Sequence, residues 1–164
     1  MKRNASFPFG ATSTGDDAPR ALDHGALDAV LGYQLSLADV PSKRLYFKHI
    51  GEPFRLRPVE YSLLVLVLFN GNDVTQKQLG QALCLPAPNL TILLDKLAER
   101  ALIARERSEV DRRVQHVRLT DVGMRLAQAA HARVPAMERE WSGLLSAQEK
   151  ALLARLLRKM AGRT

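Results

Sequence analysis

Leucines in the middle of the chain recur with the spacing of an α-helix. The apolar residues that set this spacing are Leu90, Leu93, Leu94, Leu97 and Ala101. They follow the i, i+3, i+4, i+7 rule, which predicts a helix over residues 86–101 with one buried face and one exposed polar face. Pro86 and Pro88 do not oppose this helix, because both fall in its first turn, where amide hydrogens have no partner within the helix.

A shorter helix is predicted just before it, over residues 75–83. Thr75 and Gln78 stand in the T-x-x-Q spacing that lets side chain and backbone of a first helical turn cap each other. Three apolar residues of this helix are expected to face inward: Leu79, Ala82 and Leu83. With Cys84 and Leu85 as the connecting turn, the two segments form a helix–turn–helix.

Residues 102–119 alternate like two strands of a hairpin around a charged tip at 108–113. The segment contains five arginines: Arg105, Arg107, Arg112, Arg113 and Arg118. Glu106, Glu109 and Asp111 neutralise part of this charge, so the hairpin is not an indiscriminate polycation. An arginine at such a tip suits a narrow DNA minor groove, whose negative potential attracts it. The hairpin is therefore interpreted as a wing beside the helix–turn–helix.

Helices are also predicted on both sides of this block. Apolar spacing from Leu22 predicts a helix as far as Gly51, bent or interrupted near Pro41. A hydrophobic helix follows from Pro58 to Phe69, and another begins at Asp121, with a kink expected at Pro135. A capping box formed by Ser146 and Glu149 opens a last helix over 147–160. That helix has a leucine stripe made of Leu152, Leu153, Leu156, Leu157 and Met160. A monomer would leave this stripe exposed to solvent, which favours a homodimer.

The run from Ile103 to Gly123 resembles the wing and following helix of MarR-family regulators. The most specific parts are 111–113 (DRR) and 117–123 (VRLTDVG), and the resemblance extends over roughly residues 22 to 161. It implies a mainly α-helical fold with a small β-hairpin wing: a winged helix–turn–helix with long N- and C-terminal dimerisation helices. The implied domains are a flexible N-terminal arm (1–20), an N-terminal dimerisation helix and linker (21–57), a DNA-binding domain (58–120) and C-terminal dimerisation helices (121–164).

The resemblance also implies a function and its site. The chain is expected to be a homodimeric transcriptional regulator that binds a near-palindromic operator in double-stranded DNA, as a repressor of nearby genes. Residues expected to contact DNA are Thr75, Gln76, Lys77, Pro88, Asn89, Thr91, Ile92, Lys96, Arg105, Arg107, Arg112 and Arg113. Among them Arg113 would enter the minor groove at the wing tip, with Asp111 bracing the wing, while Arg105 and Arg107 would meet phosphates or stabilise the hairpin.

Three parts of the sequence depart from the family's pattern. Residues 86–88 are Pro-Ala-Pro where the family often has serine and basic residues, and Ile92 stands where a basic residue is frequent. Base recognition is therefore expected to depend on Asn89, Thr91 and apolar contact of Ile92 with thymine methyl groups. Ala101 replaces the glycine that is usual before the first wing strand.

Composition favours this class over enzymes. The 164-residue chain has a net charge of +7, which favours a polyanionic partner. Residues 73–119 alone have eight basic and six acidic side chains, so the placement of charge must matter more than its total. No nucleophile with a base, metal cluster or glycine-rich phosphate loop stands at recognisable spacing, and neither catalysis nor a cofactor is expected.

MarR-family regulators resemble one another in having a small-molecule cleft. Five residues lie on segments that the resemblance places near it: Tyr33, Tyr46, His49, Arg55 and Tyr61. Arginine or histidine beside tyrosines suits an aromatic acid, another organic carboxylate or a thioester, whose binding would lower operator affinity. The alternative is that these residues have ordinary core and surface positions, and the sequence leaves both open.

Two further alternatives concern Cys84 and the partner. Cys84 is the only cysteine, so it is expected to be a small buried packing residue, with a redox sensor as the alternative. A winged-helix module that binds protein or RNA is the alternative to a DNA-binding regulator. No apolar run approaches the ~20 residues that cross a bilayer, and residues 1–20 lack a signal-peptide centre, so a cytoplasmic protein is expected. Phe7 and Phe9 in that arm could instead dock on a partner subunit.

Overall fold

The structure, a computed structural model, describes residues 21–71, 74–108, 111, 113–141 and 143–163. The predicted arm at 1–20, with Phe7 and Phe9, and the candidate DNA contact Arg112 lie outside these residues. The chain forms two compact units. The larger unit is Lys43–Glu140, and the terminal unit is made of the segments up to Ser42 and from Trp141 onward.

The first helical segment is more irregular than its apolar spacing predicted. It consists of a 3-10 helix η1 (Gly25–Ala29), α1 (Leu31–Tyr46), a π-helix η2 (Phe47–Gly51) and a short α2 (Glu52–Phe54). The helix does not begin at Leu22, and Pro41 does not interrupt it but lies within α1. The irregularity instead falls at η2, where a Cβ on Gly51 would lie 2.4 Å from the Phe47 ring. The wide turn brings that ring against the glycine backbone, which only a residue without a side chain permits.

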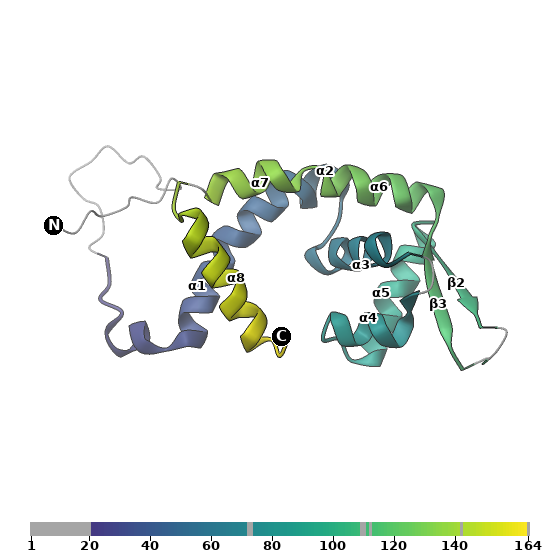
Figure 1. Cartoon of the computed structure of the whole chain (residues 1–164), viewed down its shortest axis with the longest axis horizontal. Helices are drawn as coiled ribbons and strands as arrows, with labels where there is room; N and C mark the ends of the chain where they lie inside the picture. The colour runs from purple at the N-terminus through teal and green to yellow at the C-terminus, as the bar shows by residue number, and fades with distance from the viewer. Residues whose placement is uncertain (1–20, 72–73, 109–110, 112, 142, 164) are drawn as a thin grey trace. The chain divides into compact units, whose positions relative to one another are not determined.

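The core of the larger unit is built around α3 (Pro58–Asn70). Leu63, Leu64 and Val67 of this helix are fully buried. α6 (Asp121–His131) packs along α3, as Figure 1 shows. Gly123 at the start of α6 lies so close to Leu102 that a Cβ there would overlap the Leu102 carbonyl oxygen at 1.8 Å. The absence of a side chain at residue 123 therefore lets α6 approach the end of the helix–turn–helix.

The predicted helix–turn–helix is present as α4 (Gln76–Ala82) and α5 (Ala87–Glu99). Thr75 Oγ1 accepts a hydrogen bond from the Gln78 amide at 3.2 Å, and Gln78 Oε1 accepts one from the Thr75 amide at 2.8 Å, so the predicted capping box is confirmed. The predictions that Ala82 and Ala101 face inward were wrong, since both are exposed. Ala82 ends α4, and Ala101 lies beyond α5 in a left-handed conformation (φ 53°), where helical periodicity no longer applies.

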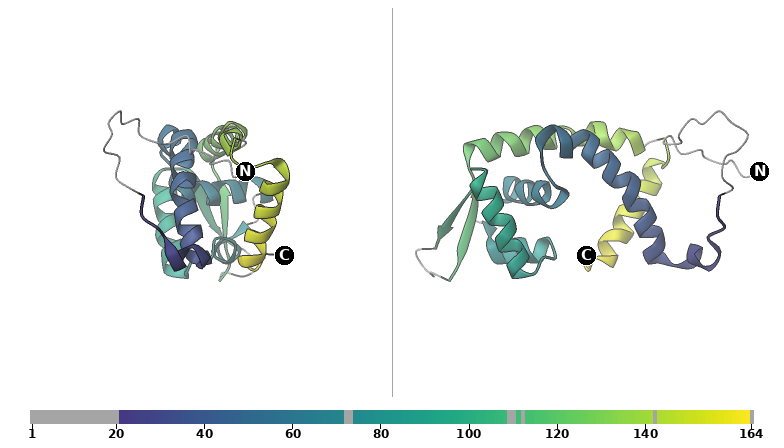
Figure 2. Two further views of the ribbon diagram at one scale, coloured as in Figure 1. Left: turned by 90° about the vertical axis from the view of Figure 1, so that its left-hand side faces the viewer. Right: turned by 180° about the vertical axis from the view of Figure 1, so that it is seen from behind.

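The wing is a hairpin of β2 (Ile103–Arg107) and β3 (Gln115–Leu119) in antiparallel register, with Ile103 opposite Leu119 and Arg105 opposite Val117. A third strand, β1 (Val74–Thr75), pairs with the other edge of β3, giving the order β1-β3-β2. Two residues carry too little alternation to be predicted as a strand. In the right-hand view of Figure 2 the hairpin lies at one end of the larger unit, beside α4 and α5.

The last two helices are α7 (Val134–Trp141) and α8 (Ala147–Met160). Pro135 lies in the first turn of α7, so the predicted kink is a complete break between α6 and α7. The capping box of Ser146 and Glu149 is confirmed at the start of α8. All five residues of the predicted leucine stripe of α8 are exposed in the single chain. Among the described residues, no helix combines the length and the apolar character needed to cross a bilayer.

Candidate nucleic-acid interface

The outward face of α5 is held in position by its inward face. Leu90, Leu93, Leu94 and Leu97 are buried in the core, as the spacing predicted. The opposite side chains are exposed: Pro88, Asn89, Thr91, Ile92 and Lys96. Ile92 is 53% exposed although it is a large apolar residue. The amide of Asn89 forms no hydrogen bond within the described part of the chain, so its donor and acceptor are available to a ligand.

Thr91 differs from its neighbours because its hydroxyl is already engaged. Thr91 Oγ1 donates to the Ala87 carbonyl at 3.0 Å and accepts from Gln76 Nε2 at 3.3 Å. Gln76 is the first residue of α4, so this contact joins the starts of the two helices. Thr91 and Gln76, both predicted DNA contacts, therefore orient each other in the free protein.

A groove of about 960 Å³ lies between the start of α4, the turn and the wing. The predicted contacts that line it are Thr75, Gln76, Lys77, Arg107 and Arg113. Its lining also includes Cys84, Pro86 and Ala87 from the turn and from the start of α5. The structure thus brings one group of predicted residues into a shared groove, while Asn89, Ile92 and Lys96 lie on the face of α5 outside that lining.

The wing tip is closed by hydrogen bonds around Asp111. Its Oδ1 accepts from the backbone amide of Arg113 at 2.9 Å, and its own amide donates to Ser108 Oγ at 3.3 Å. The amide of Ser108 also donates to the Val114 carbonyl at 3.0 Å. Asp111 therefore fixes the backbone that presents the exposed Arg113 side chain.

The basic residues of this surface fall into two groups. Arg105 pairs with Asp95 of α5 at 2.5 Å, and Arg118 pairs with Glu106 on the neighbouring strand at 3.2 Å. The second group comprises Lys77, Lys96, Arg107 and Arg113, and no ion pair joins these four to an acid of the described residues. Arg105 thus stabilises the hairpin against α5, whereas the four unpaired cations can meet an anion without first losing a partner.

Cys84 is exposed, which corrects the prediction that it is a buried packing residue. It has a left-handed backbone (φ 52°) at the turn, between the half-buried Leu83 and Leu85. Cys84 lines the groove together with Leu85, while Leu83 and Leu85 also pack against the core. Its apolar neighbours in sequence gave the wrong signal, because α4 and its helical period end two residues before it, at Ala82.

The candidate effector residues in the larger unit have internal partners. The buried Tyr46 donates its hydroxyl to the Leu56 carbonyl at 3.0 Å, and its ring lies 5.9 Å from that of Tyr61. The Tyr61 hydroxyl is 3.0 Å from His131 Nδ1. Burial raises the pKa of Tyr46, with smaller effects of Tyr61 and Glu60, and burial also raises the pKa of Tyr61. Both phenols are therefore neutral at physiological pH.

His49, Arg55 and Tyr33 have different surroundings. His49 Nε2 lies 2.6 Å from Glu140 Oε1, which also accepts from Lys48 Nζ at 2.7 Å. These hydrogen bonds, first that of Lys48 and then that of His49, lower the pKa of Glu140. Arg55 is exposed with a left-handed backbone (φ 50°). Tyr33 belongs to the terminal unit, where its hydroxyl lies 2.8 Å from His24 Nδ1.

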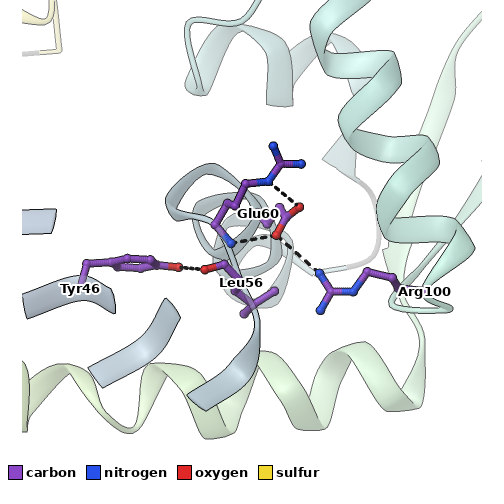
Figure 3. A network of polar contacts seen from close by, with 5 residues as sticks. Tyr46, Leu56, Glu60 and Arg100 are labelled. Carbon is purple, nitrogen blue, oxygen red and sulfur yellow. Dashed lines mark hydrogen bonds and ion pairs between the residues drawn. The ribbon is translucent and has the colours of Figure 1, made fainter. Parts of the chain in front are cut away.

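Glu60 is a buried charged residue that the sequence analysis missed. It is 5% exposed and is the one buried charged residue among those described. Its carboxylate accepts from the Arg57 amide at 2.8 Å, from Arg57 Nε at 3.2 Å and from Arg100 Nη1 at 3.5 Å (Figure 3). The available signal was its position at the third residue of an apolar helix that begins with proline, where a carboxylate caps the free amides.

This architecture, a helix–turn–helix with an adjoining hairpin, is the winged helix–turn–helix of DNA-binding regulators, and the comparisons with known proteins agree. Residues 56–114 match the model of the MarR family. The chain is 29% identical over 113 residues to the HTH-type transcriptional regulator MhqR of Bacillus subtilis (strain 168), covering 69% of this chain and 77% of that protein.

Two solved structures of regulators named CouR are similar to this chain over almost their whole length. The transcriptional repressor CouR bound to a 23-mer DNA duplex is 31% identical, with a TM-score of 0.76, over 86% of this chain and 99% of that one. CouR from Rhodococcus jostii RHA1 bound to p-coumaroyl-CoA is 28% identical, with a TM-score of 0.74, over 85% and 97%. The chain belongs to the MarR family of transcriptional regulators, which confirms the predicted family and fold.

Proposed function

We propose that this chain is a homodimeric repressor that binds a near-palindromic operator in double-stranded DNA. The observation that supports this most strongly is the combination, within one compact unit, of an exposed polar face on α5 and a wing in which Arg107 and Arg113 have no ion-pair partner among the described residues. The 31% identical CouR, whose structure is that of a repressor on a DNA duplex, supports the same role. The proposed role involves no catalytic step and is exerted in the cytoplasm, where bacterial regulators meet chromosomal DNA.

In this proposal α5 enters the major groove. Asn89 has a free amide that can pair with an adenine edge, and the exposed Ile92 can contact a thymine methyl group. The wing extends to the adjacent minor groove with Arg113, where width and negative potential favour a guanidinium. Lys77 and Arg107 neutralise phosphates beside the groove between α4 and the wing.

The homodimer proposal depends on exposed apolar side chains of the terminal unit. The exposed residues of this unit include Leu27, Leu31, Leu37, Leu152, Leu153, Leu156, Leu157 and Met160. A soluble monomer rarely exposes so many large apolar residues on neighbouring helical turns. A second copy would bury them and would present two α5 helices to successive major grooves.

We also propose that a small organic anion, an aromatic acid or its thioester, releases the operator. The structure of CouR with p-coumaroyl-CoA supports a ligand of this class in a similar fold. Tyr46, Tyr61 and His49 offer aromatic and imidazole groups, and the exposed Arg55 offers a cation for a carboxylate. Such a ligand would act by favouring a dimer geometry in which the two α5 helices miss successive grooves.

Exposure of Cys84 supports a second candidate, a redox-responsive regulator. The thiol lines the groove that would face DNA, so an oxidised or conjugated sulfur there would obstruct the duplex. Peroxide should then abolish operator binding by the wild-type protein but not by Cys84→Ser. Equal binding by both proteins after peroxide treatment would eliminate this candidate.

The experiment that tests the main proposal is selection of genomic fragments by the purified protein, followed by binding measurements across a salt series. A protein that recognises an operator should bind a selected fragment at least ~10³ times more tightly than random duplex. Its log affinity should fall linearly with log salt, with a slope near −0.9 for each phosphate neutralised. Binding without any preferred fragment, or stronger binding to RNA than to duplex DNA, would contradict the proposal and favour an interaction module.

A further inference from the structure

Glu60 connects two helices that are far apart in the sequence. It lies in the first turn of α3, and Arg100, which contacts its carboxylate, is the C-cap residue directly after α5. An ionised carboxylate at 5% exposure needs compensating partners, because burial removes its hydration. Arg57 supplies two of these from the start of the same helix, and Arg100 supplies the third across 40 positions of sequence.

The two arginines therefore have different structural consequences. Arg57 precedes α3 directly, so its hydrogen bonds with Glu60 stabilise only the beginning of that helix. The contact with Arg100 instead restrains the end of α5. Because hydrogen bonds are directional and the hydrophobic effect is not, a polar contact at this end adds to side-chain packing in fixing the rotation and translation of α5 on the core.

Glu60 is itself held in place from the side of α1. The Leu56 carbonyl accepts from the Tyr46 hydroxyl at 3.0 Å (Figure 3). The Leu56 amide donates to the Gly51 carbonyl at 3.0 Å. Leu56 is almost completely buried, and Arg57 follows it in the chain. The backbone that leads into α3 is therefore restrained from this side, and Arg57 in turn binds the Glu60 carboxylate through its amide and its Nε.

Two further contacts restrain the rest of α5. Thr91 near its start is bonded to Gln76, and Asp95 in its middle is paired with Arg105 of the wing. The link between Glu60 and Arg100 is the restraint at its far end. We propose that Glu60 is a positioning residue for base recognition: acting through Arg100, it holds α5 so that Asn89 and Ile92 meet base edges in register. This inference rests on the proposed DNA-binding function.

The sign of the expected effect separates positioning from electrostatics. Glu60→Gln removes a negative charge from a unit that binds a polyanion, so long-range electrostatics alone would raise the affinity for every DNA. Loss of the restraint on α5 would instead lower operator affinity without lowering random-duplex affinity, because phosphate contacts tolerate a small displacement better than base contacts do. We expect about a tenfold loss on the operator alone.

The test uses the full-length dimer with an operator obtained by genomic-fragment selection and a random duplex of equal length. Glu52→Gln is the charge-matched control, since Glu52 is an exposed residue of α2 in the same unit. The control should bind both duplexes as the wild type does, within about twofold. Glu60→Gln with wild-type or higher operator affinity, or with equal losses on both duplexes, would overturn the inference.

A second variant keeps the inference falsifiable if Glu60→Gln unfolds. Arg100→Lys retains the positive charge at the end of α5 but loses the guanidinium geometry that reaches Glu60. We expect the same selective loss on the operator, and a double variant no weaker than either single variant, because both changes break one contact. Additive losses would show that the two residues act separately and would overturn the proposal.

The two proposals fail differently. A wild-type protein without preference for any fragment contradicts the DNA-binding function and the inference together. A wild-type protein that prefers an operator, with Glu60→Gln preferring it equally, contradicts only the role of Glu60.

Discussion

Gly123 is the position at which a single added carbon is least tolerated. A Cβ there would overlap the Leu102 carbonyl oxygen, and this neighbour is backbone that cannot rotate away. Thr120 adds to the constraint, because its hydroxyl donates to the Ala101 carbonyl at 2.6 Å and accepts from the Gly123 amide at 3.0 Å. The start of α6 is thus fastened to the connection between α5 and β2.

We therefore expect Gly123→Ala to destabilise the protein strongly, by about 3 kcal/mol, through forced displacement of α6. Thermal unfolding followed by circular dichroism should show a midpoint lower by about 10 °C. Gly143→Ala is the matched control, since a Cβ at residue 143 meets nothing within 4 Å. An unchanged midpoint for Gly123→Ala would mean that the close approach of α6 is not required.

Asn89 and Arg113 should differ in what their loss does to DNA binding. Asn89→Ala removes a candidate base contact, so it should cost about 1 to 3 kcal/mol on the operator and relax preference at one or two base pairs. Arg113→Ala should weaken operator binding while the fold and dimer persist. Competition binding with single-base operator variants measures both effects. If Asn89→Ala loses equal affinity for operator and random DNA, Asn89 contacts the DNA backbone and not a base.

At the scale of elements, the connection between α5 and β2 carries an unfavourable residue. Ala101 has φ 53°, a conformation that costs an alanine about 1 to 2 kcal/mol and a glycine far less. Alanine stands there in place of the glycine that is usual in the family, and the left-handed geometry is kept nonetheless. The tertiary contacts around Thr120 hold this backbone against the preference of its residue.

Ala101→Gly should consequently stabilise the protein by about 0.5 to 1 kcal/mol, the difference between the conformational strain relieved and the chain entropy added. The midpoint of thermal unfolding should rise by about 2 °C. Ala98→Gly, within α5, should have the opposite sign because glycine is unfavourable inside a helix. A destabilised Ala101→Gly protein would contradict the assigned strain.

Most elements that were predicted correctly depend on interactions between residues that are close together in the sequence. Capping at Thr75 and Ser146, proline at the start of α5 and the leucine period of that helix all depend on residues within one or two turns. The π-helix beside Gly51 and the two-residue β1 depend on packing against distant residues, and they were not predicted. The same distinction applies to the site. Arg113 was identified from the local hairpin pattern, whereas the role of Glu60 depends on its contact with Arg100, which is distant in the sequence. The exposure of Cys84 was not predicted because it depends on the conformation of the turn.

At the scale of the whole molecule, we expect the largest loss of operator binding from substitutions in the exposed apolar stripe of α8. Leu153→Lys combined with Leu156→Lys should yield a monomer whose larger unit stays folded. Operator affinity should fall by about 10² or more because the second half-site is no longer held at high effective concentration. Light scattering and operator titration measure the two effects.

The control for this variant is Ala151→Lys combined with Ala154→Lys, which adds the same charge to the other face of α8. Added lysines favour DNA electrostatically, so a loss limited to the leucine variant cannot come from charge. A leucine variant that remains dimeric would place the subunit interface elsewhere.

The hydrogen bond between Gln76 and Thr91 has a consequence for anyone who wishes to redirect this regulator to a new target sequence. If residues of α5 alone are grafted onto another member of the family, Thr91 loses Gln76, the partner that aligns α4 with α5. Positions 76 and 91 should therefore be exchanged as a pair. Libraries that randomise either position alone will yield variants with misaligned helices more often than variants with a new sequence specificity.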